Sequence, residues 1–451
     1  MDVLRKKRAF VSGCESINPQ VIQDDQPVVG KKKPSPPSFV GVPDVLPVEL
    51  SDSQLLLNSS ARAGGDSRLI REEVSSGNPW QAIYAEEGPD ADLVSKLKLI
   101  DYRRVPMEKP VAIIYNPNSG RKENLVPQIR ERLDEASVPY EFLFTAGPLD
   151  TFRFANEMDL TKYSVLCAVG GDGSYHEVIN GMLARPDGQR IPIAVAPKGS
   201  GNDFCRSLGI MSLEDALDNI IQATSIRIDT TRVLVDRDDE EDLPSGVERL
   251  ANCRHMVINS AVAMPARIAN SAVPLKRCCG TLSYTFATLW EAIKGNFVPD
   301  IYAISVDDEL VGGADVNTSL LMVNQGKHCG GGMIVTPFAC INDGLVDITW
   351  ISDPAINNLL GIAGMLDDAK KRGGIQAYKG QHTYMRGKKI RLDFHGRNGR
   401  RVATNTVPQL LGIDGEELTY TRRVSYEVMP TNLEVIFNVD PYFREDQVFN
   451  P

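Results

Sequence analysis

The sequence has no long hydrophobic run, no patterned cysteines and no excess of positive charge. No apolar stretch approaches the roughly eighteen residues that a membrane-spanning helix needs, so any contact with a bilayer is expected to be peripheral. The eight cysteines follow the spacing neither of a metal site nor of a disulfide framework, which favours a reducing compartment. The net charge of −10 argues against general binding of nucleic acid, which relies on basic surfaces.

The N-terminal region, residues 1–105, differs from the rest of the chain. The run Lys31–Ser38 and the polar stretch Ser51–Asn78 have no sustained periodicity, so this region is expected to be low in complexity, extended and without a core of its own. A protein partner bound through it is one possible use. We expect a cytoplasmic protein, with mitochondrial import as the alternative because Arg5–Arg8 are all basic.

The remaining sequence is organised around Val165–Phe204. The apolar run Val165–Val169 ends in Gly170–Ser174, after which apolar residues recur at helical spacing. This pattern predicts a strand, a tight loop and a helix. A loop in that position presents backbone N–H groups at a helix N-terminus, which favours an anion such as phosphate, and its glycines let the backbone approach a ligand closely.

Two further strand ends have the same character. The run Ile193–Ala196 leads into Pro197–Asp203, and Val111–Tyr115 leads into Asn116–Gly120. Each of these loops is rich in Gly, Ser and Asn, residues that stop a strand and offer hydrogen bonds. Ordinary turns between strands and helices would explain one such loop, but several in order favour a phosphate site.

The chain order predicts two structured domains. Alternating strands and helices indicate an α/β domain with a mostly parallel sheet at residues 106–228. Period-two segments such as 302–306, 320–323, 346–351, 390–394 and 433–437 predict a mainly antiparallel β domain at residues 229–438, interrupted by helices near 282–294 and 354–372. Residues 439–451 are expected to be a tail. The predicted fold class is α/β plus β.

These motifs resemble the signature of the diacylglycerol kinase and sphingosine kinase superfamily of lipid kinases. The matching stretches are Asn116–Gly120, Gly170–Ser174, Glu177–Gly181, Pro197–Asp203, Gly330–Met333, Asp343–Asp347 and Asp414–Glu416. The resemblance covers roughly residues 108–438. It implies a Rossmann-like α/β nucleotide domain, a β-sandwich-like lipid-binding domain, and an ATP site in the cleft between them.

The resemblance also implies which residues form the site. Asp172 and Glu416 are the predicted catalytic carboxylates, and which of them removes the proton is left open. The predicted Mg²⁺ residues are Asp172, Asp229, Asp343 and Glu416, although an ordinary Asp-Gly turn is an equal interpretation of Asp343. The predicted ATP-binding residues are Asn116, Ser119, Gly120, Thr145, Gly170, Gly171, Gly173, Ser174, Gly199, Ser200, Gly201, Asn202 and Asp203.

The expected substrate is a membrane lipid with a free hydroxyl, either diacylglycerol-like or a ceramide or sphingoid base. The stretch Asn259–Arg267, where the resemblance places the lipid pocket, contains no acid, and Arg267 is expected to repel the ammonium of a sphingoid base. Seven basic residues between Arg386 and Arg401 surround one acid, Asp393. They are read either as a patch for anionic lipid or as solvated strand ends. His176 is expected to be a surface or packing residue.

Two other functions compete with this prediction. An NAD kinase shares the Gly-Gly-Asp-Gly loop but does not account for Pro197–Asp203 together with Asp414–Glu416. A kinase fold kept as a non-catalytic structural or interaction subunit is favoured by the missing acid in Asn259–Arg267. The intact Asp172, Asp203 and Glu416 oppose that reading.

Overall fold

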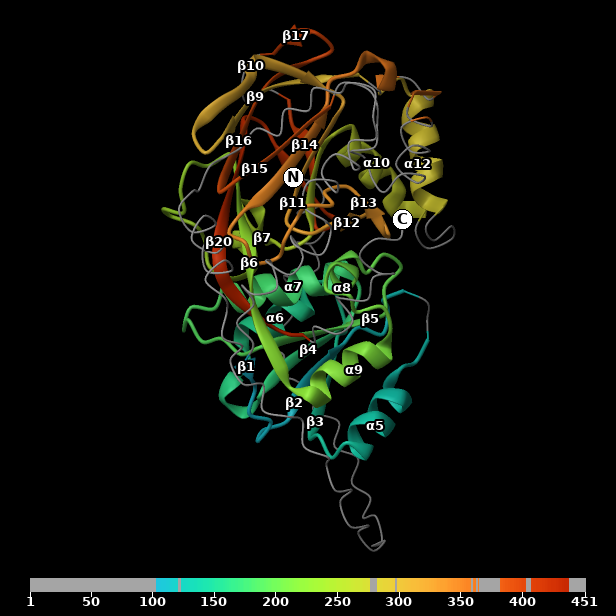
Figure 1. Ribbon diagram of the computed structural model, residues 1–451, viewed down its shortest axis with the longest axis vertical. Helices are drawn as coiled ribbons and strands as arrows, with labels where there is room; N and C mark the ends of the chain where they lie inside the picture. Colours follow the sequence, from blue (N-terminus) through green and yellow to red (C-terminus); the bar gives the residue numbers. More distant parts are fainter. Residues whose placement is uncertain are drawn as a thin grey trace, which may run out of the picture.

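The structure, a computed structural model, describes residues 103–120, 123–275, 282–296, 298–357, 360–361, 364, 382–402 and 407–437. Nearly all of the N-terminal region 1–105, the tail 439–451 and most of the helix expected at 354–372 lie outside these residues. Figure 1 shows two regions, one with helices around a sheet and the other built mainly of strands.

The first region is a parallel sheet with helices on both faces. Its described parallel strands lie in the order β3-β2-β4-β5. Their bounds are β2 (Val111–Tyr115), β3 (Tyr140–Phe144), β4 (Val165–Gly170) and β5 (Ile193–Pro197). The helices are α5 (Val126–Glu135), α6 (Asp150–Glu157), α7 (Asp172–Leu183), α8 (Asp203–Ser207) and α9 (Leu213–Gln222), with a 3₁₀ turn at Leu160–Lys162. Helix α5 contacts α9, and α6 packs along α7.

Local sequence explains these elements. Every residue of β4 is buried, as expected of a central parallel strand covered on both faces. Helix α9 begins at a capping box, in which Ser212 Oγ accepts the Asp215 N–H at 3.1 Å and Asp215 Oδ2 accepts the Ser212 N–H at 2.9 Å. The α/β layer is therefore read correctly from the sequence.

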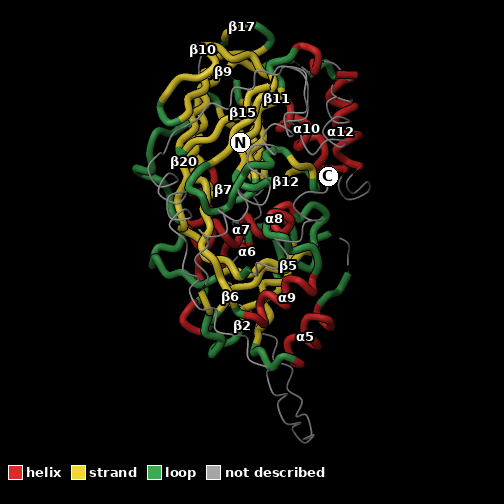
Figure 2. Tube along the Cα trace, in the orientation of Figure 1, coloured by secondary structure: helices red, strands yellow, loops and turns green. Residues whose placement is uncertain are grey.

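Two long strands connect the regions. Strand β6 (Thr224–Val235) pairs antiparallel with β20 (Arg423–Ile436), from Ser225 opposite Ile436 to Val235 opposite Val424. Near its end β20 runs parallel to β5, and near its start it pairs with a strand of the β region. Figure 2 shows this pair of strands passing from one region into the other.

The continuous strands change the expected domain description. The division predicted at residue 228 falls inside β6, and the strand expected at 433–437 is the end of β20. That end extends the parallel sheet instead of lying wholly in the antiparallel domain. The sequence predicted only this last part of β20. Hydrophobic periodicity does not reveal that a strand continues through a bulge, such as the register shift between Met429 and Leu433.

The second region is a sandwich of two antiparallel layers. One layer continues the large sheet through β9 (Asp300–Val306), β10 (Glu309–Thr318), β16 (Lys389–Arg397) and β17 (Arg400–Arg401). The other contains β8 (Asn259–Ala263), β11 (Leu320–Asn324), β14 (Val346–Ile351), β15 (His382–Gly387), β18 (Gln409–Ile413) and β19 (Glu416–Tyr420). Buried side chains from both layers, among them Ile304, Leu321 and Leu392, form one core.

Short elements and two helices complete this region. The strands are β7 (Cys253–Met256), β12 (His328–Cys329) and β13 (Met333–Ile334), and 3₁₀ turns lie at Gly246–Ala251, Val273–Leu275 and Pro354–Asn357. Strand β1 (Arg103–Arg104) instead pairs with the start of β6, at Thr224 and Ser225, beside the α/β region. Helix α10 (Met264–Ala272) packs on β8, β11 and β18, and α12 (Leu282–Ile293), predicted near 282–294, packs on α10. Among the described residues, no helix is long and apolar enough to cross a bilayer.

Helix α7 joins the two regions through Asn180, whereas Glu177 and Gly181 of the same stretch pack it against α6 in its own region. Glu177 Oε1 accepts the N–H of Leu149 at the start of α6. Asn180 accepts the His255 N–H at 2.7 Å and donates to the His255 carbonyl at 2.9 Å, so it pairs with β7 as a strand would. A Cβ on Gly181 would lie 2.3 Å from the Phe152 carbonyl oxygen of α6. This motif is therefore explained by packing.

We expect Asn180→Ala to lower the free energy of unfolding by about 2–4 kcal/mol, because it leaves two backbone groups of His255 without their partner. Urea unfolding of the purified chain measures this loss. Asn156→Ala is the matched control, since Asn156 donates one hydrogen bond to Gly181 and is expected to cost about 1 kcal/mol. Equal losses in the two variants would contradict the joining role of Asn180.

Candidate functional site

The three glycine-rich loops meet at one edge of the parallel sheet. They follow β2, β4 and β5, which are neighbours in the sheet. The Asn116 N–H donates to the Val169 carbonyl at 3.1 Å, and the Lys198 N–H donates to the Gly170 carbonyl at 2.7 Å. The loops 116–120, 170–174 and 197–203 therefore lie side by side at the carboxyl ends of their strands, where open α/β sheets bind ligands.

The glycines let these loops touch one another. A Cβ on Gly199 would lie 2.5 Å from the Cα of Gly171, and a Cβ on Gly120 would lie 1.7 Å from the Lys198 carbonyl oxygen. Gly120 also has a φ of +61°, which favours glycine. The sequence explanation, close approach of the backbone to a ligand, is thus incomplete, because contact between loops already requires glycine at these positions.

Side chains of the predicted ATP-binding set hold the loops in register. Asn116 Nδ2 donates to Ser174 Oγ at 3.2 Å. Asn202, at a φ of +55°, accepts the Gly199 N–H and donates to the Gly199 carbonyl, both at 2.9 Å. Thr145 is buried at the end of β3, and its N–H donates to the Tyr115 carbonyl at 3.0 Å. These contacts place all four residues at or beside the loops.

Lys198 is a residue of this site that the sequence analysis did not single out. Its Nζ donates to the Ser119 carbonyl at 2.7 Å and lies 5.4 Å from the centre of the Tyr115 ring. Burial lowers the pKa of the Lys198 amine. Lys198 therefore ties the first loop to the third. Its position between Pro197 and Gly199 of a recognised motif was the available signal.

Asp172 of the second loop and Asp203 of the third loop lie close to each other. Asp172 opens α7, and its Oδ1 accepts the Phe204 N–H at 3.2 Å. Asp203 is buried and accepts the N–H groups of Gly331, at 2.9 Å, and Gly332, at 2.7 Å. A Cβ on Gly201 would lie 2.8 Å from Asp172 Oδ2, so glycine leaves room for this carboxylate.

The surroundings of Asp172 change its acidity. Burial, and after it the negative charge of Asp203, raise the pKa of the Asp172 carboxyl to about 6, while N–H groups of Phe204 and Asp203 oppose the shift. A carboxyl whose pKa is raised toward neutral pH suits the role of a general base.

Glu416 reaches the start of α7 from the other region. It opens β19, and its Oε1 lies 3.1 Å from the point where a Cβ on Gly173 would stand. The charges of Glu416 and Asp414 also act on Arg254, whose pKa is lowered to about 10 by burial despite them. Fold geometry thus brings Glu416 beside the residue that follows Asp172. No sequence motif pointed to Arg254.

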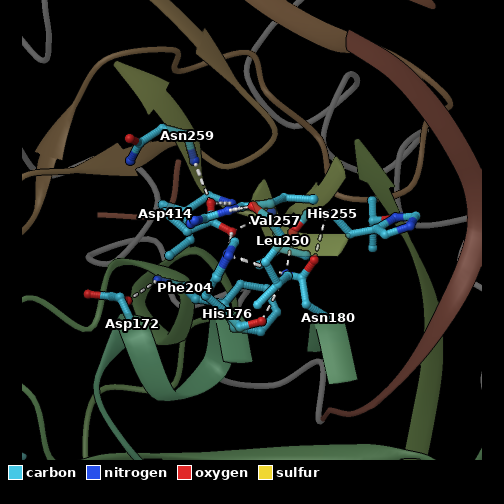
Figure 3. A network of polar contacts seen from close by, with 12 residues as sticks. Asp172, His176, Asn180, Phe204, Leu250, His255, Val257, Asn259 and Asp414 are labelled. Atoms are coloured by element: carbon cyan, nitrogen blue, oxygen red, sulfur yellow. Dashed lines mark hydrogen bonds and ion pairs between the residues drawn. The ribbon is translucent and has the colours of Figure 1, made fainter. Parts of the chain in front are cut away.

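Asp414 holds the turn that carries Glu416. Its Oδ1 accepts the N–H groups of Ile258, at 2.9 Å, and Asn259, at 3.1 Å, and its Oδ2 lies 2.9 Å from His176 Nδ1. Figure 3 shows this network between α7 and the turn. His176 and Asp414 are both almost fully buried. His176 is therefore a packing residue, as one of the two expectations had it, and not a surface residue.

The four predicted Mg²⁺ residues fall into two separate groups. Asp229 is fully buried and accepts the N–H groups of Gly344 and Thr431, each at 2.7 Å. Burial raises the pKa of its carboxyl to about 6. Asp343 accepts the Leu345 N–H at 3.1 Å and pairs with Arg386. In the described part of the chain, no three acidic, His or Cys side chains are arranged to hold a metal ion.

The basic cluster and Arg267 are engaged by acids from distant parts of the sequence. Arg267 is buried and lies 2.9 Å from Asp300, so the expected repulsion of an ammonium substrate loses its basis. Most of the cluster between Arg386 and Arg401 is paired as well. The pairs are Arg386 with Asp343 and Asp347, Lys389 with Glu427, Arg391 with Asp393, Arg397 with Asp300, and Arg401 with Asp315. Apart from Asp393, these partners were not part of either interpretation offered for the cluster.

We expect Asp229→Asn to lower the free energy of unfolding by about 1–3 kcal/mol. The substitution replaces one carboxylate oxygen with an NH₂ group, which cannot accept the backbone N–H that it faces. Urea unfolding measures this loss. Titration with Mg²⁺ in an activity assay should give the same half-saturating concentration as wild type. A tenfold change in that concentration without a loss of stability would assign Asp229 to a metal site instead.

Comparison with known proteins matches both regions to families. Residues 110–233 match the diacylglycerol kinase catalytic domain, and residues 258–437 match the YegS C-terminal NAD kinase beta sandwich-like domain. A probable lipid kinase YegS-like protein of Shewanella frigidimarina is 27% identical over 292 residues, which are 64% of this chain and 81% of that protein. Sphingosine kinase B of Dictyostelium discoideum is 30% identical over 110 residues, which are 23% of this chain and only 14% of that protein.

Solved structures share the fold. The crystal structure of a diacylglycerol kinase from Bacillus anthracis aligns over 73% of this chain and 97% of its own, with a TM-score of 0.50 and 18% identity. A second structure from the same organism has a TM-score of 0.54 and 20% identity, with the same coverage. Lipid kinase families thus match both the α/β region and the β region, and the chain belongs to the superfamily of diacylglycerol and sphingosine kinases.

Proposed function

We propose that this chain transfers the γ-phosphoryl group of ATP to a hydroxyl group of a membrane lipid. The main support is the position of Asp172, which opens α7 beside the glycine loops and precedes Gly173, the residue that faces Glu416. Its surroundings raise the pKa of its carboxyl to about 6. The superfamily of kinases to which the chain belongs supports the use of ATP.

The loops fit the phosphates of ATP. The positive end of the α7 dipole favours a polyanion at this edge of the sheet. Several loop N–H groups, among them those of Asn116, Ser119 and Gly199, are donated within the protein, so the phosphates would bind to other N–H groups of these loops. Lys198 holds two of these loops together through the Ser119 carbonyl, so contacts within the protein itself help to shape the cradle. A preformed cradle reduces the conformational entropy that binding must remove.

The proton of the acceptor hydroxyl goes to a carboxylate. In this proposal Asp172 takes it, the hydroxyl oxygen bonds to the γ-phosphorus, and the bond to the bridging oxygen breaks, with its electron pair leaving on ADP. Glu416 is the alternative base. When bound, Mg²⁺ would offset the negative charge that develops on the phosphates, and the oxygens of Asp172 and Glu416 are donors of the kind it prefers.

The acceptor in this proposal is an uncharged lipid alcohol, diacylglycerol-like or ceramide-like, ahead of a sphingoid base. The stretch Asn259–Arg267 offers no carboxylate for an ammonium group. Its Ala261, Met264 and Ala266 instead belong to an apolar cluster with Leu320 and Met322. Because Asp300 neutralises Arg267, the preference for an uncharged acceptor comes from the missing acid and not from repulsion by Arg267.

We expect Asp172→Asn to reduce phosphoryl transfer by about 10²–10⁴-fold, because it removes the proton acceptor. The assay follows label from ATP into mixed micelles that contain diacylglycerol, monoacylglycerol, ceramide or sphingosine. Glu416→Gln should lose activity as well, whereas Glu417→Gln, on the same strand, is the control that should retain it. Absence of ATP binding and of transfer in wild type would favour the non-catalytic interaction subunit, and stabilisation by NAD alone would favour an NAD kinase.

We also expect kcat/KM to fall as the pH drops below about 6, since protonation of Asp172 removes the base. Asp203→Asn removes the negative charge that helps to raise this pKa, so its acid limb should move to lower pH. Initial rates between pH 4.5 and 8 on folded protein test both expectations. An acid limb with the same midpoint in wild type and Asp203→Asn would contradict the assignment to Asp172.

A further inference from the structure

Helix α12 exposes a continuous apolar face. Phe286, Leu289, Trp290 and Ile293 are 50%, 43%, 54% and 69% exposed, respectively. Their spacing of three, four and seven residues places them on one side of the helix. Other large exposed apolar side chains of the described residues, such as Met211, Leu310 and Val407, lie in separate parts of the chain. Four neighbouring side chains of this kind mark an interaction surface.

The opposite face of α12 is fixed to the protein. Ala287 is fully buried and Glu291 is 3% exposed, and the helix packs on α10. Glu291 accepts hydrogen bonds from Ser271 of α10, at 2.5 Å, and from Asn296, at 2.7 Å. The one acid of this helix is therefore turned inward, and α12 cannot roll its apolar side into the core without breaking these bonds.

The chemistry of the exposed face fits a lipid surface. Lys294 follows the helix and is partly exposed. Its Nζ lies 5.4 Å from the centre of the Trp290 ring and 3.0 Å from Glu291 Oε1, so the apolar side chains, and not an unpaired charge, are the main feature of this face. Trp and Lys are residues that settle at the headgroup level of a bilayer, and Phe, Leu and Ile enter the acyl boundary below it. The described side chains of this face include no carboxylate that anionic lipid would repel.

The position of α12 also fits the proposed reaction. The helix packs on α10, which begins at Met264 within the stretch Asn259–Arg267 proposed for the lipid acceptor. An acceptor that stays in a bilayer can reach that stretch only if this side of the protein meets the membrane. The basic cluster between Arg386 and Arg401, the earlier candidate for membrane contact, is largely occupied by ion pairs.

We propose that α12 docks the enzyme on an anionic membrane surface, with Phe286, Leu289, Trp290 and Ile293 inserted at the headgroup boundary. This inference rests on the proposed lipid kinase function for its biological purpose, but docking itself is measurable without catalysis. A second copy of the chain or another protein on the same face is the competing occupant that the experiment must exclude.

The first experiment measures sedimentation of the full chain with phosphatidylcholine vesicles that contain about a third phosphatidylserine. We expect Ile293→Glu and Leu289→Glu each to weaken binding about tenfold or more, because each places a charge where an apolar side chain would be buried. Leu310→Glu is the matched control, since Leu310 is 55% exposed on β10, away from α12. Its binding should equal that of wild type.

Two measurements distinguish a membrane from a second copy of the chain as the occupant of this face. Fluorescence reports whether Trp290 enters the vesicle, and light scattering reports whether the chain is a monomer or a dimer. Tryptophan emission should shift to shorter wavelength on adding vesicles, and Trp290→Phe should abolish the shift. Unchanged vesicle binding in Ile293→Glu and Leu289→Glu would overturn the proposal. So would a wild-type dimer that either variant converts to a monomer without weakening vesicle binding, because the face would then bind a second copy.

Activity assays distinguish failure of docking from failure of the proposed function. Ile293→Glu should phosphorylate a short-chain acceptor dispersed in water at the wild-type rate and lose activity only with bilayer-embedded acceptor. Equal loss on both acceptors would overturn a docking role for α12. Wild type that binds vesicles through α12 but phosphorylates no acceptor would support docking and overturn the kinase proposal.

Discussion

The site depends on the hydrogen bonds that the buried carboxylate of Asp414 accepts. It accepts N–H groups from Val257, Ile258 and Asn259 and pairs with His176 of α7. A buried charge is tolerated only when such partners replace water. One partner lies on α7, and the others lie at or just before the start of β8. The same carboxylate therefore fixes the two regions to each other and holds the turn that presents Glu416.

Close packing of the glycine loops has a chemical consequence. Contact between Gly171 and Gly199 brings the third loop against α7, and this brings Asp203 near Asp172. The two effects of that closeness, loss of water and a neighbouring negative charge, both favour the protonated form of Asp172. The raised pKa therefore follows from how the loops pack.

Electrostatic pairing neutralises most of the basic cluster between Arg386 and Arg401, which weakens it as a candidate membrane surface. In sequence the segment around Arg391 contains almost only positive charge, but in the fold Asp300, Asp315 and Asp347 lie against it. Paired charges of this kind contribute little to binding an anionic surface. The exposed apolar side of α12 is then the better candidate, and it lies beside α10, near the proposed acceptor stretch.

The sequence by itself determined the local elements, because apolar runs, glycine loops and the Ser212 capping box depend only on near neighbours. It also predicted one site formed by Asp172 and the loops 116–120, 170–174 and 197–203, and the fold brings these loops side by side. Tertiary structure alone decided that β6 and β20 each pass through both regions, that Asp229 serves two turns, and that Arg267 is neutralised. These features arise from contacts between residues far apart in the chain, which local periodicity does not encode.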